Sequence, residues 1–285
     1  MGQLKQTEVG MFNAPIVKVT ALLLLLGFVP PSAHAISTLD KVVKSKVLRC
    51  GVMLDSPPSG FRTPANEPDG FDVAYCLDMA KSLGAKPEIV ETPSIDRIPA
   101  LVSDRIDVLI ASTTNTPERA LTVAFSQPYM NYTSGVLTTK KSGIKTFADL
   151  KGRRLGGVTG TATERQLNKI IQDWHNPKTT YTGYESDADA FLALQQGKVD
   201  AILQSTVVNS ALIASGQFPE FTTAGVAPTP PDLVSIAVKR EDQQFLNWVR
   251  LFVWSQVETG RFKELYNKYF GPGEVPDLTL KGVDY

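Results

Sequence analysis

The sequence is poor in the residues that carry most metal and nucleophilic chemistry. It has two histidines and two cysteines in 285 residues. His34 lies beside the N-terminal apolar run and His175 stands alone, so no histidine pair is available for a metal ion or a Ser-His-acid triad. A glycine-rich turn at residues 156–161 lacks the Gly-Lys-Ser/Thr ending of a nucleotide-binding loop. We therefore predict no metal site and no cofactor.

The chain also lacks an excess of either charge. Lys plus Arg and Asp plus Glu number 29 each. A balanced charge provides no basic field for nucleic acid and no polybasic patch for anionic lipid. We expect neither nucleic acid nor a lipid surface among its partners.

Long hydrophobic runs are missing as well, apart from residues 19–29 near the N-terminus. This run is too short for a membrane span, which needs roughly 20 residues. The small residues at 30–35 that follow it have the A-x-A arrangement of a cleavage site. We predict a signal peptide over residues 1–35, cleaved after Ala35, and an exported, periplasmic mature chain.

The two cysteines leave their pairing open. Cys50 lies in a strand-like run and Cys76 among apolar helical positions. They could form a disulfide in an oxidising compartment, and two buried thiols fit the pattern equally well.

Strand and helix patterns alternate along the mature chain. Strands are expected at 47–53, 88–91 and 107–111 with helices at 38–44, 71–83 and 97–103, and a Pro/Gly-rich binding loop at 55–70. A second set follows, with strands at 136–139, 154–158, 179–182 and 199–203 and helices at 147–150, 163–174 and 186–196. The chain then returns toward the first set with a strand at 234–238 and a long helical region at 243–270 that is broken at Gly260. Such alternation predicts α/β layers around mostly parallel sheets. Two similar sets predict two lobes that face one cleft.

Residues 107–119 carry the strongest site signal. A buried-strand pattern runs into the hydroxyls of Ser112, Thr113, Thr114 and Thr116, then into Pro117 and Arg119. Thr116 and Pro117 suit a capped helix start. Hydroxyl donors, free backbone N–H groups and a guanidinium fork together suit a carboxylate. The alternative is a plain capped helix whose Arg119 pairs with a surface acid.

Seven short motifs resemble the polar-amino-acid family of exported solute-binding proteins of ABC importers, extracellular solute-binding protein family 3. They are Gly70-Phe-Asp-Val, Arg97-Ile-Pro-Ala-Leu, the segment 112–119, Phe125-Ser-x-Pro-Tyr, Asp149-Leu-Lys-Gly, Gly160-Thr161 and Gly197-Lys-Val-Asp-Ala. They stand in the family's order over nearly all of residues 36–270.

The resemblance implies a two-lobed α/β fold, the type II periplasmic-binding-protein fold, in which two crossover strands join the lobes. Lobe 1 is expected at 36–133 and 232–285, and lobe 2 at 134–231. It also implies a monomer that captures an amino acid or related small carboxylate and delivers it to a membrane permease. No chemistry is implied.

Four residues take roles from the resemblance. Arg119 matches the arginine that grips the ligand's α-carboxylate, and Ser112 and Thr114 match positions that bind the carboxylate and ammonium. Thr161 matches the lobe 2 contact to the carboxylate, although a threonine after glycine also serves as a plain helix cap.

One position departs from the family pattern. The aspartate that usually accepts the ligand's α-ammonium is Ser205 here. Either another group holds the ammonium, or the ligand lacks one, or the alignment slips by a residue or two.

The ligand's side chain is expected to face residues of lobe 1. These are Met53, Asp55, Ser59, Phe61 and Arg97. Asp55 suits a cationic or amide group, or it caps the Pro-Pro turn. Phe61 is a ligand wall or a core residue, and Arg97 suits a side-chain carboxylate.

Two rival functions share this fold. A cyclohexadienyl-dehydratase-like enzyme needs a general acid, and such enzymes have Asp-Ala-x-Glu where this chain has Ser205-Thr-Val-Val208. Val208 donates no proton. A ligand-sensing periplasmic protein would look the same, and signalling through the permease stays open.

Overall fold

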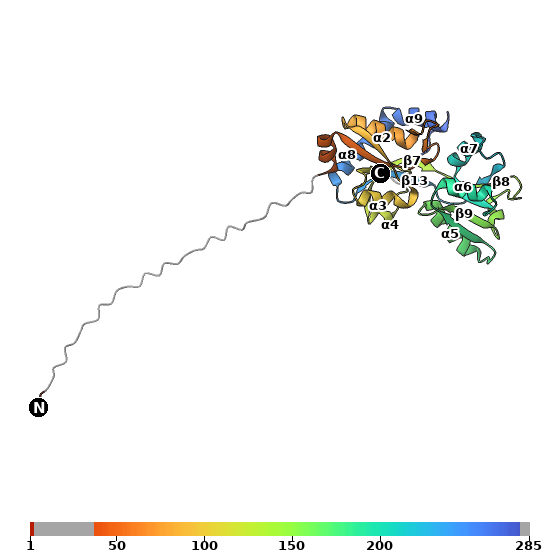
Figure 1. The fold of residues 1–285 in the computed structure, drawn as a ribbon, viewed down its shortest axis with the longest axis horizontal. Helices are drawn as coiled ribbons and strands as arrows, with labels where there is room; N and C mark the ends of the chain where they lie inside the picture. The colour runs from red at the N-terminus through yellow and green to blue at the C-terminus, as the bar shows by residue number, and fades with distance from the viewer. Residues whose placement is uncertain (3–36, 280–285) are drawn as a thin grey trace. The chain divides into compact units, whose positions relative to one another are not determined.

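The computed structural model describes residues 1–2 and 37–279. Most described residues belong to two five-stranded sheets and the helices that cover them. In Figure 1 the green-to-cyan elements of the second sheet gather beside the orange, yellow and blue elements of the first. The predicted signal peptide and its cleavage point fall almost wholly outside the described residues.

The first sheet has the order β5-β1-β6-β13-β7. Its strands are β1 (Val47–Val52), β5 (Lys86–Glu91), β6 (Val108–Leu109), β7 (Val123–Tyr132) and β13 (Asp232–Lys239). β1 runs parallel to β5 and β6, whereas β13 runs antiparallel to β6 and β7. The C-terminal part of the chain thus completes a sheet that the N-terminal part begins.

The second sheet repeats this arrangement in the order β10-β9-β11-β8-β12. Its strands are β8 (Ser134–Thr139), β9 (Arg154–Val158), β10 (Thr180–Tyr184), β11 (Ala201–Ser205) and β12 (Phe221–Val226). β9 is parallel to β10 and β11, and β8 is antiparallel to β11 and β12. The chain passes between the sheets twice, from β7 to β8 and from β12 to β13.

Helices connect and cover the strands. They are α1 (Thr38–Ser45), α2 (Phe71–Ser82), α3 (Arg97–Val102), α4 (Pro117–Ala120), α5 (Ala162–Trp174), α6 (Asp187–Gln195), α7 (Thr206–Ala214), α8 (Gln243–Glu258) and α9 (Arg261–Phe270), with short 3₁₀ turns at Ser94–Asp96 and Phe147–Leu150. The predicted break at Gly260 separates α8 from α9, with Gly260 at a φ of 77°. The mixed α/β class expected from the sequence is confirmed.

Four segments differ from the sequence prediction. The loop predicted at 55–70 contains a small sheet of β2 (Asp55–Ser56), β3 (Gly60–Arg62) and β4 (Pro68–Asp69). β7 was not predicted, since Pro128 interrupts its pattern; it is tolerated because β7 lies at the sheet edge and its register shifts near that residue. α7 and β12 were also missed.

Gly70 fixes the start of α2. Its φ is 128°, and a Cβ built there would lie 2.6 Å from the carbonyl oxygen of Ser59. Only glycine combines this backbone conformation with so close an approach. The turn therefore sets α2 tightly against the small sheet.

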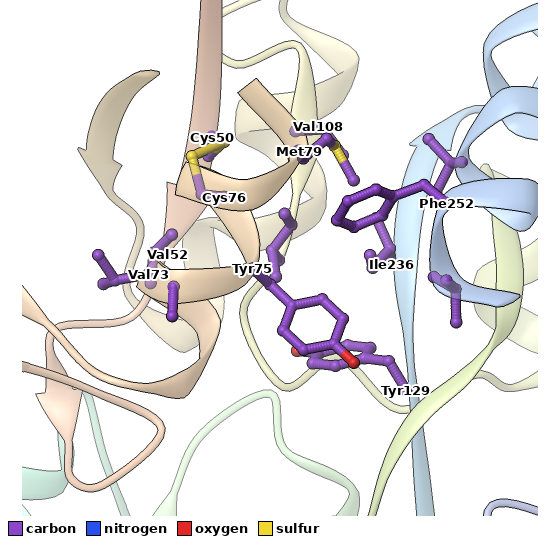
Figure 2. Packing of buried hydrophobic residues seen from close by; sticks show 14 of the residues in the cluster. Cys50, Val52, Val73, Tyr75, Cys76, Met79, Val108, Tyr129, Ile236 and Phe252 are labelled. Carbon is purple, nitrogen blue, oxygen red and sulfur yellow. A yellow bond between two sulfur atoms is a disulfide. The ribbon is translucent and has the colours of Figure 1, made fainter. Parts of the chain in front are cut away.

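The core of the first sheet packs around a disulfide between Cys50 of β1 and Cys76 of α2, whose Cα atoms lie 6.1 Å apart (Figure 2). The pairing that the sequence left open is thus present. Tyr75 of the same helix is fully buried and packs its ring 5.2 Å from that of Tyr129 on β7, measured between centroids. These contacts join α2 to both β1 and the edge strand that leads into the second sheet.

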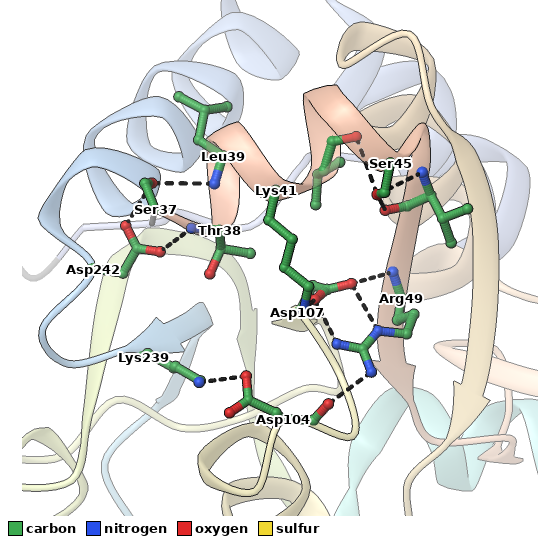
Figure 3. A network of polar contacts seen from close by, with 12 residues as sticks. Ser37, Thr38, Leu39, Lys41, Ser45, Arg49, Asp104, Asp107, Lys239 and Asp242 are labelled. Carbon is green, nitrogen blue, oxygen red and sulfur yellow. Dashed lines mark hydrogen bonds and ion pairs between the residues drawn. The ribbon is translucent and has the colours of Figure 1, made fainter. Parts of the chain in front are cut away.

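A polar network holds the other end of the first sheet together (Figure 3). Asp107, just before β6, accepts hydrogen bonds from Lys41 Nζ of α1 at 2.9 Å and from Arg49 Nη2 of β1 at 2.7 Å. Burial opposes ionisation of Asp107, yet these donors hold its pKa below the usual value. These hydrogen bonds hold the first residue of segment 107–119 against α1 and β1.

Candidate functional site

A cavity lies where residues of both sheets meet, and we call it the central cavity. It is lined by Met53, Ser56, Ser59, Arg97, Ser112, Thr114, Tyr132, Ser134, Thr161, Ala162, Thr163, Asp187, Gln204, Ser205, Val208 and Asp232. Ten residues were predicted from the sequence to contact the ligand, and seven of them lie in this wall, namely Met53, Ser59, Arg97, Ser112, Thr114, Thr161 and Ser205. Asp55, Phe61 and Arg119 do not.

Ser112 is held at three points. Its Oγ donates to Asp72 Oδ2 at 2.9 Å, its backbone N–H donates to Tyr129 Oη at 3.1 Å, and its carbonyl accepts from Arg97 Nη1 at 3.1 Å. Its φ is 45°, a left-handed conformation that costs a serine energy and persists only where its surroundings impose it. The three hydrogen bonds therefore hold Ser112 in this conformation and fix its position in the cavity wall.

Asp72 was missed by the sequence reasoning, which used it only as part of the Gly70-Phe-Asp-Val motif. Its side chain is buried behind Ser112, and its Oδ1 accepts from Tyr129 Oη at 2.8 Å. Burial raises its pKa to about 7, while the hydrogen bonds from Tyr129 and Ser112 act in the opposite direction. Asp72 thus supports the wall without lining the cavity.

Arg97 is fully buried and reaches the cavity from the first turn of α3. Its Nη1 donates to the carbonyl of Ala111 at 2.9 Å, its Nε donates to the carbonyl of Ser94 at 3.2 Å, and its Nη2 contacts the Ser94 hydroxyl. Burial lowers its pKa, and Asp232 and Asp187 act to raise it. A guanidinium so desolvated creates a strong local preference for an anion.

Arg119 lies behind the central cavity, in a neighbouring hollow that it shares with Arg165 and Arg97. Its Nη1 donates to the carbonyl of Thr114 at 2.9 Å. Its Nη2 donates at 2.7 Å to the carbonyl of Gly160, which lies in the turn between β9 and α5. Burial, together with the charges of Arg97 and Arg165, lowers its pKa to about 10. Among the described carboxylates, none pairs with it.

The predicted helix start beside Arg119 is present. Thr116 caps α4, and its hydroxyl accepts from the backbone N–H of Arg119 at 3.2 Å, with Pro117 in the first turn. The cap therefore fixes the start of the helix that carries Arg119.

Thr161 is the N-cap of α5. Its hydroxyl accepts from the Glu164 backbone N–H at 3.0 Å and donates to the carbonyl of Val158 at 2.7 Å. The capping interpretation is therefore correct for the hydroxyl, and Thr161 also lines the cavity. The start of α5 presents the positive end of its dipole to this wall.

Two acids meet across the sheets at one end of the cavity. Asp55 Oδ2, from β2, accepts from the backbone N–H of Asp187 in α6 at 3.1 Å. Asp187 is buried, and its Oδ1 accepts from Gln204 Nε2 at 2.5 Å. Burial, together with the nearby charge of Asp55, raises the pKa of Asp187 to about 7. Asp55 therefore contacts α6, the helix that connects β10 and β11 of the second sheet.

Phe61 pairs with Asp55 in the small sheet and is half-buried outside the cavity wall. It is not among the residues that the structure brings together.

Ser205 and Asp232 complete the wall. Ser205 ends β11, and its Oγ is buried without a hydrogen-bond partner. Asp232 begins β13; burial raises its pKa, whereas Thr114, Arg119 and Arg97 act to lower it. Asp232, like Asp187, escaped the sequence reasoning because both look like ordinary acids at the start of an element.

Neither a metal-binding cluster nor a membrane-spanning helix is present among residues 1–2 and 37–279. No group of three or more His, Cys, Asp or Glu side chains there is arranged to hold a metal ion. Among the same residues, every helix is too short or too polar to cross a membrane. What the cavity contains is arginine, carboxylate and hydroxyl groups, which suits a small polar ligand.

Comparison with known proteins identifies the family. The model of bacterial extracellular solute-binding proteins, family 3, matches residues 48–272, and the chain belongs to this family. The ABC transporter arginine-binding protein 1 of Escherichia coli (strain K12) is 29% identical over 224 residues, covering 77% of this chain and 89% of that protein. The expected family, solute-binding function and two-lobed α/β fold are thus confirmed.

Solved structures give the same result. The solute receptor for L-cysteine of Neisseria gonorrhoeae has a TM-score of 0.75 and 30% identity, covering 82% of this chain and 93% of that one. The ancestral amino acid-binding protein AncCDT-1, a precursor of cyclohexadienyl dehydratase, has a TM-score of 0.73 and 30% identity, covering 82% and 100%. These relatives are binding proteins rather than enzymes.

Proposed function

We propose that the protein is exported to the periplasm, binds one amino acid or related small carboxylate between its lobes, and delivers it unchanged to the permease of an ABC importer. Residues 36–133 and 232–285 form lobe 1 and residues 134–231 form lobe 2, in line with the strands of the two sheets. The protein acts as a monomer, and the signal peptide of residues 1–35 directs its export.

The observation that carries this proposal is the arginine at the junction of the two sheets. The Arg119 guanidinium already links Thr114 on one side to Gly160 on the other through their carbonyl oxygens. A carboxylate in the central cavity meets Arg97 and the hydroxyl of Thr114 from lobe 1 and the start of α5 from lobe 2, and the charge of Arg119 lies in the neighbouring hollow. Contacts made only when both lobes engage the anion favour the closed form.

Two further observations support capture without chemistry. Val208, the position where a dehydratase of this fold carries its acid, is an apolar part of the cavity wall. The relatives named above bind arginine and L-cysteine, which favours an amino acid here.

A thermal-shift screen of the chain from residue 36 tests the proposal. Amino acids, deaminated carboxylates and opines are each added in excess, and a ligand that binds only the folded form stabilises it by about 2.7 kcal/mol at a hundred times its Kd. We expect at least one amino acid or small carboxylate to raise the unfolding temperature. If none does while another class of compound does, the proposal is wrong.

A further inference from the structure

Two polar atoms in the wall of the central cavity have no hydrogen-bond partner. They are Ser205 Oγ and Asp232 Oδ1, and both are buried. Leaving a buried polar atom unpaired costs about 1–3 kcal/mol, and more for a charged group. Folded proteins seldom keep such atoms unless a ligand or another partner meets them.

The strand pairings place these two atoms beside the same short piece of chain. Ser205 pairs with Ser134 in the β11–β8 ladder, and Asp232 pairs with Tyr132 in the β13–β7 ladder. Tyr132 and Ser134 are two residues apart, which in extended chain is about 7 Å. One acceptor therefore comes from each sheet, on either side of the first crossover between them.

The other carboxylates near the cavity are already engaged. Asp72 accepts from Tyr129 through one oxygen and from Ser112 through the other. Asp187 accepts from Gln204, and Asp55 accepts from the backbone of Asp187. Among the cavity-lining carboxylates in residues 37–279, Asp232 alone has a buried oxygen without a donor.

We propose that Asp232 Oδ1 and Ser205 Oγ together accept hydrogen bonds from the α-ammonium group of the ligand. An ammonium carries three donors and no acceptor, so it satisfies both atoms at once. This inference rests on the proposed function and deepens it: the ligand is a zwitterionic amino acid, not a deaminated carboxylate. Asp232 then balances the charge of the ammonium, while Arg97 in the same wall and Arg119 in the neighbouring hollow attract the carboxylate.

The test compares ligands that differ only in the amino group. L-cysteine is paired with mercaptopropionate and L-arginine with guanidinopentanoate, and calorimetry measures each Kd for wild type and for Asp232→Asn. A charge-assisted hydrogen bond contributes about 1.5–3 kcal/mol, so Asp232→Asn is expected to weaken the amino acid that binds by about 10- to 100-fold. Its deaminated partner, weaker from the start, should change less than about threefold.

Two further variants provide controls. Ser205→Ala removes a neutral acceptor and is expected to weaken the amino acid by about tenfold or less. Asp187→Asn changes the other buried carboxylate of the wall, and any loss it causes should fall equally on both members of a pair. The comparison within each variant separates the role of Asp232 from a general effect on folding.

The outcomes are distinct. If wild type binds the deaminated acids as tightly as the amino acids, or Asp232→Asn weakens both members of a pair alike, the assignment of Asp232 is overturned while the solute-binding proposal stands. If wild type binds no amino acid and no carboxylate, both proposals fail.

Discussion

Replacing Asp72 by asparagine is expected to change how the stability of the protein depends on pH. Asp72 is 1% exposed and supports Ser112 and Tyr129, so its carboxyl group has no access to water. Burial raises its pKa from 3.8 to about 7 in the folded chain. Asparagine resembles the protonated acid in shape and cannot ionise.

The sign and size of the effect follow from linkage. Between about pH 4 and pH 7 the folded chain keeps a proton on Asp72 that the unfolded chain has lost, so stability falls as the pH rises. A difference of about three pKa units corresponds to about 4 kcal/mol, at about 1.4 kcal/mol for each pH unit. The contribution is complete below about pH 4 and is lost once the pH passes the folded pKa.

Urea unfolding followed by tryptophan fluorescence measures this directly, since the chain has three tryptophans. The free energy of unfolding is measured for wild type and Asp72→Asn from acid to mildly basic pH, and the difference between the two is plotted. Asp173→Asn, a change at an exposed position of α5, is the control. A difference between wild type and Asp72→Asn that stays constant across this range would show that Asp72 ionises like an exposed acid and refute the reasoning.

Two other predictions concern the disulfide and the anion anchor. The disulfide joins residues 26 apart, so reducing it is expected to cost about 3.5 kcal/mol from loop entropy and lower the unfolding temperature by about 7–14 °C; an unchanged temperature, with reduction verified by mass, would contradict this. Arg119→Ala is expected to weaken amino-acid binding by about 3 kcal/mol, a hundredfold or more in Kd, whereas Arg165→Ala, an exposed arginine in the same hollow, should change it little. Equal losses in calorimetry would argue against Arg119 as the anchor.

Local features of the site could be predicted because they depend on neighbouring residues. Thr116 and Pro117 indicate the start of a helix, and Arg119 lies in its first turn, three residues after the N-cap Thr116. The turn before α5 was predictable for the same reason, since Gly160 and Thr161 are adjacent.

The acids of the site could not be predicted, because their burial depends on distant parts of the chain. Asp187 reads as an ordinary acid in the first turn of a helix, and only the approach of Asp55 and Gln204 makes it a buried cavity residue. Asp232 follows a Pro-Pro pair and reads as a loop acid until β13 pairs with β7. Arg97, in contrast, was expected to face the ligand, and only its burial depends on the distant carbonyls of Ala111 and Ser112.

The edge strand β7 shows a second limit of sequence patterns. Pro128 in its middle argues against a strand, and only the position of β7 at the edge of the sheet makes the proline acceptable. That position is a property of the whole fold.

We propose that this chain captures an amino acid in the central cavity, where residues of both sheets meet. Titration calorimetry of the chain from residue 36, with the amino acid that gives the largest thermal shift, tests it most directly. We expect saturable binding with one ligand per chain. Heats that never saturate for any amino acid, from a protein shown to be folded, would contradict it.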